Sequence, residues 1–309
     1  MSMKKALLPS ILLLSILLAG CHKEELKVAY LNFSESTTIT MDVSTFNQEH
    51  GTNYDASELA CIANQKFPDL WVYANGTTLG TWEIPCKVPV IFNDSTNFII
   101  YPGVKLNGVS TMRPRYPFVN AYSMTTSFEN GEVRNVENIT FKYAPTTHFE
   151  FIENFTKDYN SVFHAATNNG VNFEHIADPD EPINRIGRIS LDVDTINDFE
   201  VISSDMTFGN VLPADIFLEM DYRCDVEAAE ITVTMLVDKS TTSVTTAEPL
   251  VIANAGPEWK KIYINLTKSV HRNSLNAINY RVKISGGRED SNPVHFYFDN
   301  IKVIYITSY

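Results

Sequence analysis

The stretch Trp259-Lys260-Lys261-Ile262-Tyr263-Ile264-Asn265-Leu266 sets the fold class, because apolar and polar or aromatic residues alternate along it. Side chains of a β-strand point alternately to its two faces. We therefore expect the Ile and Leu side chains to face a core, and Lys261, Tyr263 and Asn265 to face away from it.

The same period of two recurs in the C-terminal half. It is found in Phe149–Phe155, Arg188–Asp192, Ala214–Cys224, Glu230–Val237, Asn279–Ser285 and Val294–Ile306. Several short alternating strands between polar turns predict a β-sandwich or jelly roll. Cys224 lies on the apolar side of its strand, so we expect a buried free thiol there.

The N-terminal half carries hairpin signals. Leu70–Ala74 and Thr78–Glu83 flank Asn75-Gly76, a strong turn signal. Two more hairpins are predicted, one joining Val90–Phe92 to Asn97–Tyr101 and one joining Ala121–Phe128 to Val136–Tyr143. Cys86-Lys87-Val88, between two prolines, is predicted to be an edge strand or a connection. One short helix is predicted at Ala56–Ala63, with Asp55 as its N-cap.

The chain thus reads as an all-β protein with two β-sandwich domains, residues 26–145 and 147–309, divided near Pro145-Thr146-Thr147. Its 44% hydrophobic and 20% charged residues are ordinary for a globular protein. Its net charge of −13, without a cluster of Lys or Arg, makes nucleic acid a poor partner.

The first residues predict where in the cell the protein is located. Lys4 and Lys5 precede the apolar run Ala6–Leu18, the shape of a secretory signal. Leu18-Ala19-Gly20-Cys21 resembles a bacterial lipobox, which implies a signal peptide over 1–20, a lipidated Cys21 and a tether over 21–25. The alternative is an ordinary signal with a chance cysteine. His22-Lys23-Glu24-Glu25 resembles the surface-export signal of Bacteroidota lipoproteins, so we expect an outer-membrane lipoprotein facing outward.

Two family resemblances follow from longer motifs. The segment Leu70–Gly80, with Ile84-Pro85 and Val88-Pro89-Val90, resembles a PEGA-type module over roughly residues 67–105, although Cys86 stands where that family keeps a small residue. This resemblance implies a structural or adhesive spacer. In the second half, Phe151–Phe155, Glu258–Leu266 and Phe296–Val303 occur in the order typical of galactose-binding-like jelly rolls and carbohydrate-binding modules.

That second resemblance implies a structural Ca²⁺ held by an acidic residue near the first strand and by the closing Asp. The matching positions are Glu153 and Asp299, and carboxylate oxygens suit Ca²⁺. The alternative is that both side chains cap turns. A disulfide between Cys61 and Cys86 is an even alternative to two free thiols, because the sequence does not give their separation.

The sequence contains few features that are typical of a catalytic site. No nucleophile, zinc or P-loop motif is present. Glu219 and Asp221 share one strand face, as in laminarinase-like hydrolases, but Cys224 stands where that motif has its second Glu. We therefore expect no enzyme, and a glycan-processing activity is the third alternative.

Sugar binding needs aromatic faces and fixed polar groups. If the alternating strands share one sheet, they would present an aromatic and polar face made of Asp221, Arg223, Tyr263, Arg281 and Tyr297. The alternative is an ordinary mixed-charge sheet face. The leading hypothesis is a non-catalytic lipoprotein that binds extracellular glycan through its C-terminal jelly roll. The second is a structural or adhesin-like subunit with a surface protein as partner.

Overall fold

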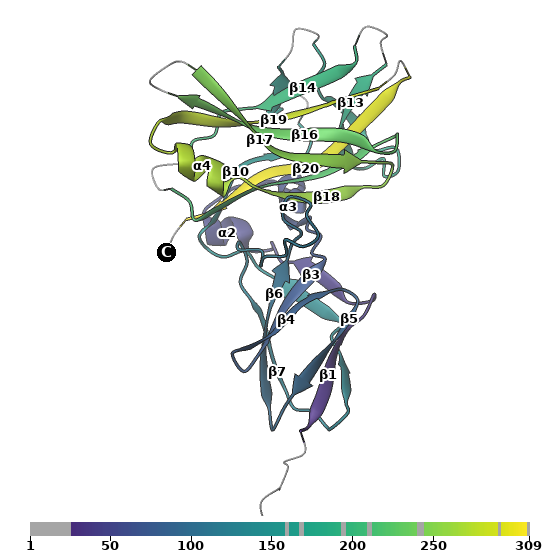
Figure 1. The fold of residues 1–309 in the computed structure, drawn as a ribbon, viewed down its shortest axis with the longest axis vertical. Coiled ribbons are helices and arrows are strands. Elements are labelled where there is room, and N and C mark those ends of the chain that lie inside the picture. The colour runs from purple at the N-terminus through teal and green to yellow at the C-terminus, as the bar shows by residue number, and fades with distance from the viewer. Residues whose placement is uncertain are drawn as a thin grey trace, which may run out of the picture.

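The computed structural model describes residues 26–157, 161–166, 170–192, 196–208, 212–239, 244–289 and 292–307. Two β-rich units lie one above the other along the long axis (Figure 1). We call the unit before residue 146 the N-terminal domain and the unit after it the C-terminal domain. The predicted signal peptide, the tether and Cys21 lie outside the described residues.

The N-terminal domain contains three sheets around one hydrophobic cluster. A four-stranded sheet has the order β4-β3-β6-β7, a three-stranded sheet the order β5-β1-β8, and β2 pairs with β9 in parallel. The strands are β1 (Val28–Phe33), β2 (Thr38–Met41), β3 (Asp69–Ala74), β4 (Thr77–Glu83), β5 (Cys86–Ile91), β6 (Thr96–Gly103), β7 (Tyr122–Thr126), β8 (Val133–Asn135) and β9 (Asn138–Phe141). Leu31, Val72, Val88 and Ile100 bring the two larger sheets into one core.

One predicted hairpin is confirmed and two are wrong. β3 and β4 pair across Asn75-Gly76, both with positive φ, as a tight two-residue turn requires. β5 is an edge strand, as predicted, and its partner is β1. β6 pairs with β3 and β7, so β5 and β6 do not form the predicted hairpin. The turn between β5 and β6 therefore carries the chain from one sheet to another. β9 and β7 also belong to different sheets: β9 pairs with β2, so the predicted hairpin between β7 and β9 is not formed.

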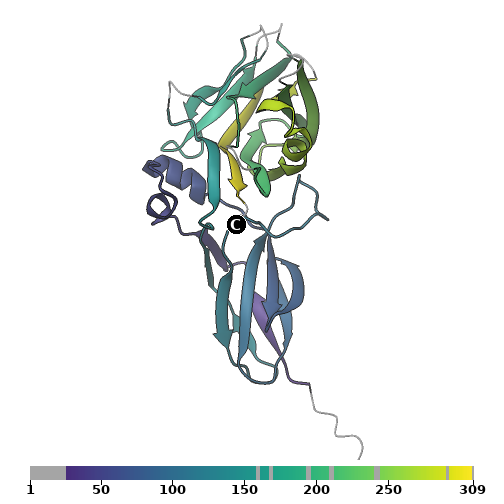
Figure 2. The ribbon, with the colours of Figure 1, turned by 90° about the vertical axis from the view of Figure 1, so that its left-hand side faces the viewer.

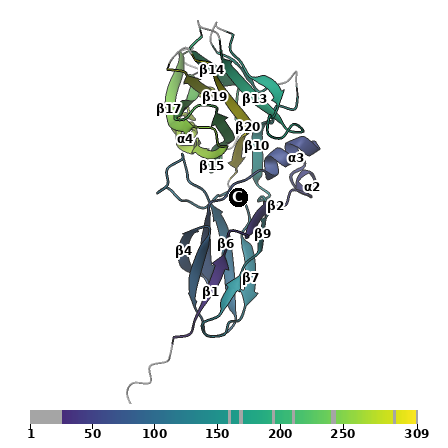
Figure 3. The same ribbon diagram turned by 90° about the vertical axis from the view of Figure 1, so that its right-hand side faces the viewer.

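Two short helices lie beside the junction of the domains (Figures 2 and 3). They are α2 (Phe46–His50) and α3 (Ala56–Ala63). The predicted helix is confirmed with its bounds, because Asp55 and Glu58 form a capping box at its start. No described helix is long and apolar enough to cross a membrane.

The C-terminal domain is a sandwich of two sheets. The first, which we call the β20 sheet, has the order β12-β13-β20-β15-β18, with β10 also paired to β20. Its strands are β10 (Thr147–Glu153), β12 (Glu174–Ala177), β13 (Arg185–Leu191), β15 (Asp215–Cys224), β18 (Lys260–Asn265) and β20 (Val294–Ile306). Its inner face carries the buried side chains of Met220, Ile262, Phe296 and Phe298.

The second sheet, which we call the β19 sheet, has the order β11-β14-β19-β16-β17. Its strands are β11 (Phe163–Ala165), β14 (Asp198–Ser203), β16 (Ala229–Lys239), β17 (Val244–Ala255) and β19 (Ala277–Gly287), and α4 (Thr267–Asn273) follows β18. The alternation did not predict β11, β12, β14, β17 or α4. Phe199, Val233 and Ile284 pack this sheet against the first, which confirms the all-β sandwich class.

Candidate functional site

The outer face of the β20 sheet holds most of the predicted ligand residues. As predicted, Lys261 and Tyr263 point away from the sandwich core, and so do Glu219 and Asp221 on β15. The N-terminal domain covers part of this face. Phe217, Tyr263 and Ile304 belong to its hydrophobic cluster, so the two domains share one core at the junction.

Tyr263 is a junction residue and not an exposed platform. Its side chain is 2% exposed, and its ring lies parallel to that of Phe67 with centroids 6.4 Å apart. Its hydroxyl accepts from the Lys66 backbone N–H at 3.0 Å and lies 3.0 Å from the Lys66 carbonyl. The predicted exposure is therefore wrong, because residues 65–67 cover this part of the sheet.

Arg281 does not share the predicted face either. It lies on β19, in the other sheet, where its guanidinium donates to Asp238 at 2.9 Å. The premise that all the alternating strands share one sheet is wrong, because β19 pairs with β14 and β16. Asp221, Arg223 and Tyr297 do lie together, since β15 pairs directly with β20.

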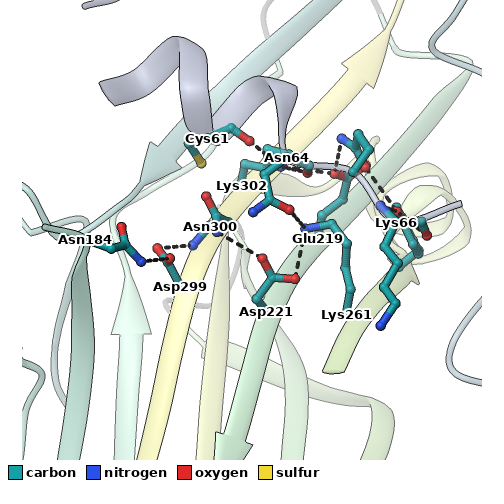
Figure 4. A network of polar contacts seen from close by, with 12 residues as sticks. Cys61, Asn64, Lys66, Asn184, Glu219, Asp221, Lys261, Asp299, Asn300 and Lys302 are labelled. Carbon is teal, nitrogen blue, oxygen red and sulfur yellow. Dashed lines mark hydrogen bonds and ion pairs between the residues drawn. The ribbon is translucent and has the colours of Figure 1, made fainter. Parts of the chain in front are cut away.

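A buried polar network fills the junction beneath α3 (Figure 4). Lys302 is fully buried and donates to the carbonyls of Cys61 at 2.8 Å and Asn64 at 3.2 Å. Its ammonium lies 3.4 Å from Glu219, which also accepts from the Tyr116 hydroxyl at 2.5 Å. Burial raises the pKa of Tyr116 well above its usual value.

A second ion pair extends this network toward solvent. Lys261 donates to Asp221 at 3.0 Å, and Asn300 donates to the other oxygen of Asp221 at 2.9 Å. Burial and the nearby Lys302 lower the pKa of Lys261. Glu219 thus links the two domains, since it accepts from Gln65 and Tyr116, and it is enclosed, whereas both partners of Asp221 belong to the C-terminal domain. A glycosidase pair would need both carboxyls to reach a bound sugar.

Glu153 and Asp299 are occupied by protein partners. Glu153 accepts from the backbone N–H groups of Phe155 at 2.9 Å and Val162 at 2.7 Å, so it caps a loop. Asp299 accepts from Asn184 at 2.9 Å, and burial raises its pKa to about 6. Among the residues described, no group of three or more His, Cys, Asp or Glu side chains is placed to hold a metal. The turn-capping alternative fits Glu153, and calcium stays a prediction.

The cysteines of the described ranges are free thiols. The Cys61–Cys86 disulfide is not formed, because Cys61 lies on α3 against the C-terminal domain whereas Cys86 begins β5 opposite Phe33. Burial raises the pKa of Cys61 to about 12 and that of Cys86 to about 11. Cys224 is fully buried in the sandwich, as predicted, and burial raises its pKa to about 11.

Beyond Asp221, the outer face carries a group of three side chains that we call the aromatic row. It consists of Tyr297, Arg223 and Trp259. The Arg223 guanidinium lies 4.7 Å from the ring centroid of Tyr297 and 5.0 Å from that of Trp259. It also donates to Asp180 at 2.7 Å. Both rings are half-buried, so each keeps some surface in solvent. The sequence favours a half-buried Trp259 in the sandwich over a ligand platform, and the ring is half-buried.

Several polar atoms next to the aromatic row have no hydrogen-bond partner within the described part of the chain. They are Nε of Arg223, Nδ1 of His295 and Oγ of Ser190. Ser190 and His295 are directly opposite each other on β13 and β20. Buried polar groups without a partner are rare and costly, and these three atoms are themselves shielded from solvent.

A cavity of about 310 Å³ opens at the other side of Trp259, between the domains. It is lined by Lys66, Pro68, Lys105, Gly108, Tyr222, Trp259, Lys260, Lys261, Ile262 and Tyr263. The N-terminal domain contributes the first four of these residues. Trp259 is therefore shared by the aromatic row and this cavity, which we call the junction cavity.

No protein-family model and no curated protein matches the chain. Its similar solved structures include three carbohydrate-binding proteins. The CBM22-1–GH10 modules of Clostridium thermocellum endo-1,4-β-D-xylanase 10B, complexed with xylohexaose, are 12% identical with a TM-score of 0.40. The match covers 52% of this chain and only 29% of that one.

The other two are single modules. The CBM22-1 xylan-binding domain of Paenibacillus barcinonensis Xyn10C is 9% identical, with a TM-score of 0.39, over 53% of this chain and 98% of that one. The family 30 module of the Clostridium thermocellum cellulase Cel9D-Cel44B is 12% identical, with a TM-score of 0.35, over 50% and 96%. Scores of this size describe a general likeness of shape and identify neither a family nor a ligand.

Proposed function

We propose that this chain is a non-catalytic lipoprotein that binds glycan through the aromatic row of its C-terminal domain. The observation that carries the proposal is the position of Arg223, within about 5 Å of the ring centroids of both Tyr297 and Trp259. Flat apolar ring faces beside fixed polar groups are the usual elements of a small-molecule site.

The polar groups of the row suit hydroxyl ligands. The side chain of Arg223 is 15% exposed and is held in place by Asp180, whose own side chain is 70% exposed. His295 and Ser190 lie opposite each other at the next register position of the same face. A sugar provides both hydroxyls for such groups and a C–H face for the rings.

Lipidation at Cys21 would anchor the chain to the outer membrane, with the C-terminal domain facing outward. Support comes from the lipobox-like residues 18–21 and the export-like residues that follow them. The anchor would hold a glycan receptor at the membrane, and the N-terminal domain would separate the aromatic row from the lipid.

A glycan array on residues 22–309, prepared without lipid, tests the proposal. Trp259→Ala and Tyr297→Ala should each weaken glycan binding about tenfold or more, because each removes an aromatic contact. Tyr73→Ala, a half-buried tyrosine of the N-terminal domain, is the matched control. Glycan binding that survives both substitutions would contradict the assignment. Repeating the array in EDTA tests the predicted Ca²⁺.

A protein partner is the second candidate, and one observation favours it. β17 is an edge strand of the β19 sheet, and Ile252 and Val244 on it are 65% and 51% exposed. Exposed edge strands with apolar side chains can pair with a strand of another protein. Cross-linking at β17 in the native envelope, together with a negative glycan array, would favour this role.

A further inference from the structure

The junction cavity has an unusual charge. Four of its ten lining residues are lysines, namely Lys66, Lys105, Lys260 and Lys261, and no carboxylate lines it. The whole chain has 37 acidic residues against 24 Lys and Arg. A cavity whose charged lining residues are all cations therefore runs against the composition of the protein, and its field favours negative ligands.

Two of these lysines already form ion pairs with carboxylates. Lys261 has a 2% exposed side chain and pairs with Asp221, and Lys105 pairs with Glu83 at 2.6 Å. The other two are exposed. Lys260 donates to the carbonyl of Asn254 at 2.9 Å, and no described contact pairs Lys66 or Lys260 with an acid. Their positive charges therefore remain for a ligand.

The walls of the junction cavity are fixed against each other. Residues of the loop after β6 bond to the edge of β18: the Asn107 N–H donates to the Tyr263 carbonyl at 2.7 Å, and Asn107 Oδ1 accepts from the Asn265 N–H at 2.9 Å. The Tyr263 hydroxyl fixes the backbone of Lys66. A preformed site loses less free energy on binding than one that must first be ordered.

We propose that the junction cavity binds the acidic group of an anionic glycan, while a neighbouring sugar lies along the aromatic row. The inference rests on the proposed glycan-binding function and adds to it the substrate class. Carboxylate and sulfate oxygens both accept hydrogen bonds from ammonium groups, and charge-assisted bonds are the stronger ones. A volume of about 310 Å³ is at the small end for ligand sites. Trp259 belongs to both the junction cavity and the aromatic row.

This assignment gives the N-terminal domain a direct part in binding, because Lys66 belongs to it and Lys260 to the other domain. Neither domain alone would carry the complete site. A purely structural spacer, one of the two roles that the PEGA resemblance implied, would not need this arrangement.

Matched pairs of polysaccharides test the inference on residues 22–309. Polygalacturonate is compared with its neutral methyl ester, and dextran sulfate with dextran, by isothermal titration calorimetry at low and high salt. At least one anionic member should bind about tenfold or more tightly than its neutral partner, and more weakly at high salt. The first pair reports a preference for carboxylate and the second for sulfate.

The double variant Lys66→Gln/Lys260→Gln should reduce anionic binding to the neutral level. The control Lys87→Gln/Lys268→Gln removes the same charge from exposed lysines on β5 and α4 and should bind as the parent does. Equal losses in both double variants would overturn the inference, because a general charge effect would explain them.

Neutral glycans bound as tightly as anionic ones would also overturn the inference, while leaving the proposed glycan-binding function in place. Binding of no polysaccharide and no array glycan would overturn both. Circular dichroism of each variant shows whether a loss reflects unfolding.

Discussion

At the scale of single residues, the pair Lys302 and Glu219 is the most consequential contact. Both side chains are fully buried, and each has further hydrogen bonds to the N-terminal domain. Removing one partner of a buried ion pair leaves an uncompensated charge. Lys302→Met should therefore lower the free energy of unfolding by about 3–5 kcal/mol, as measured by urea denaturation.

The exposed pair Lys105 and Glu83 provides the control, since their side chains are 33% and 56% exposed. Lys105→Met should lower the free energy of unfolding by less than about 1 kcal/mol. Equal effects of the two substitutions would show that the buried pair has no special role.

Asp299 predicts a dependence of stability on pH. Burial raises its pKa from 3.8 to about 6 in the folded chain. The folded state thus binds the proton more tightly than the unfolded state does, so stability falls as pH rises from about 4 to about 6. Asp299→Asn removes this cost. The variant should gain up to about 3 kcal/mol over the parent at pH 7.5 and nothing at pH 3.5.

Urea unfolding at both pH values measures this difference. Asp94→Asn, an exposed carboxylate in the turn after β5, shows how much the loss of any one negative charge contributes. A gain for Asp299→Asn that is the same at both pH values would contradict the assigned ionisation.

For single residues, the sequence predicted which way a side chain points better than it predicted which residues cover that side chain. The alternation placed Tyr263 on the face away from the sandwich core, and it lies there. What covers that face comes from residues 65–67, far away in sequence, and alternation carries no information about such contacts. Trp259 is half-buried, as the sequence favoured, but its contact with Arg223 could not be predicted because Arg223 lies on another strand, β15.

At the scale of elements, α3 stabilises the junction through its ends. Asp55 Oδ1 accepts from the backbone N–H groups of Ser57 and Glu58, and the carbonyl of Cys61 at the other end accepts from Lys302. Asp55→Ala should lower the free energy of unfolding by about 1 kcal/mol, because it removes the cap. Asp55→Asn keeps an acceptor and should cost less, and an equal loss in chemical denaturation would contradict the capping role.

Elements fixed by neighbouring residues were predictable, and their partners were not. The helix Ala56–Ala63 and the hairpin at Asn75-Gly76 depend on local capping and turn chemistry. The two wrong hairpins show the limit: β5 and β6 are adjacent in sequence but belong to different sheets. A polar turn reports that the chain changes direction, and it does not report whether the next strand returns to the same sheet.

At the scale of the whole molecule, the shared core predicts cooperative unfolding. Phe217 of the C-terminal domain lies within 5.1 Å, between ring centroids, of Phe118 of the N-terminal domain. We expect one calorimetric transition for the parent chain. Phe217→Ala should lower the transition temperature of the N-terminal domain and separate it from that of the C-terminal domain, because a cavity at the junction weakens the coupling. Two transitions in the parent chain would contradict this prediction.

The candidate site could be predicted only in part at this scale. Asp221, Arg223 and Tyr297 lie on one face, as expected, because adjacent strands carry them. Arg281 belongs to the other sheet, and the junction cavity is formed by two domains whose docking the sequence does not encode in any local pattern.

The parallel pairing of β2 with β9 has a mechanical consequence. β2 is near the start of the described chain, and β9 is the last strand before the C-terminal domain. In the proposed function, a tether that pulls toward the membrane would act first on β1, which pairs in parallel with β8, and then on β2, while a bound polymer would pull on β9 from its other end. The hydrogen bonds between β2 and β9 would then be sheared together instead of opening one by one like a zipper. Such an arrangement resists tension, as the proposed role of a receptor held between a cell and a moving polymer would require.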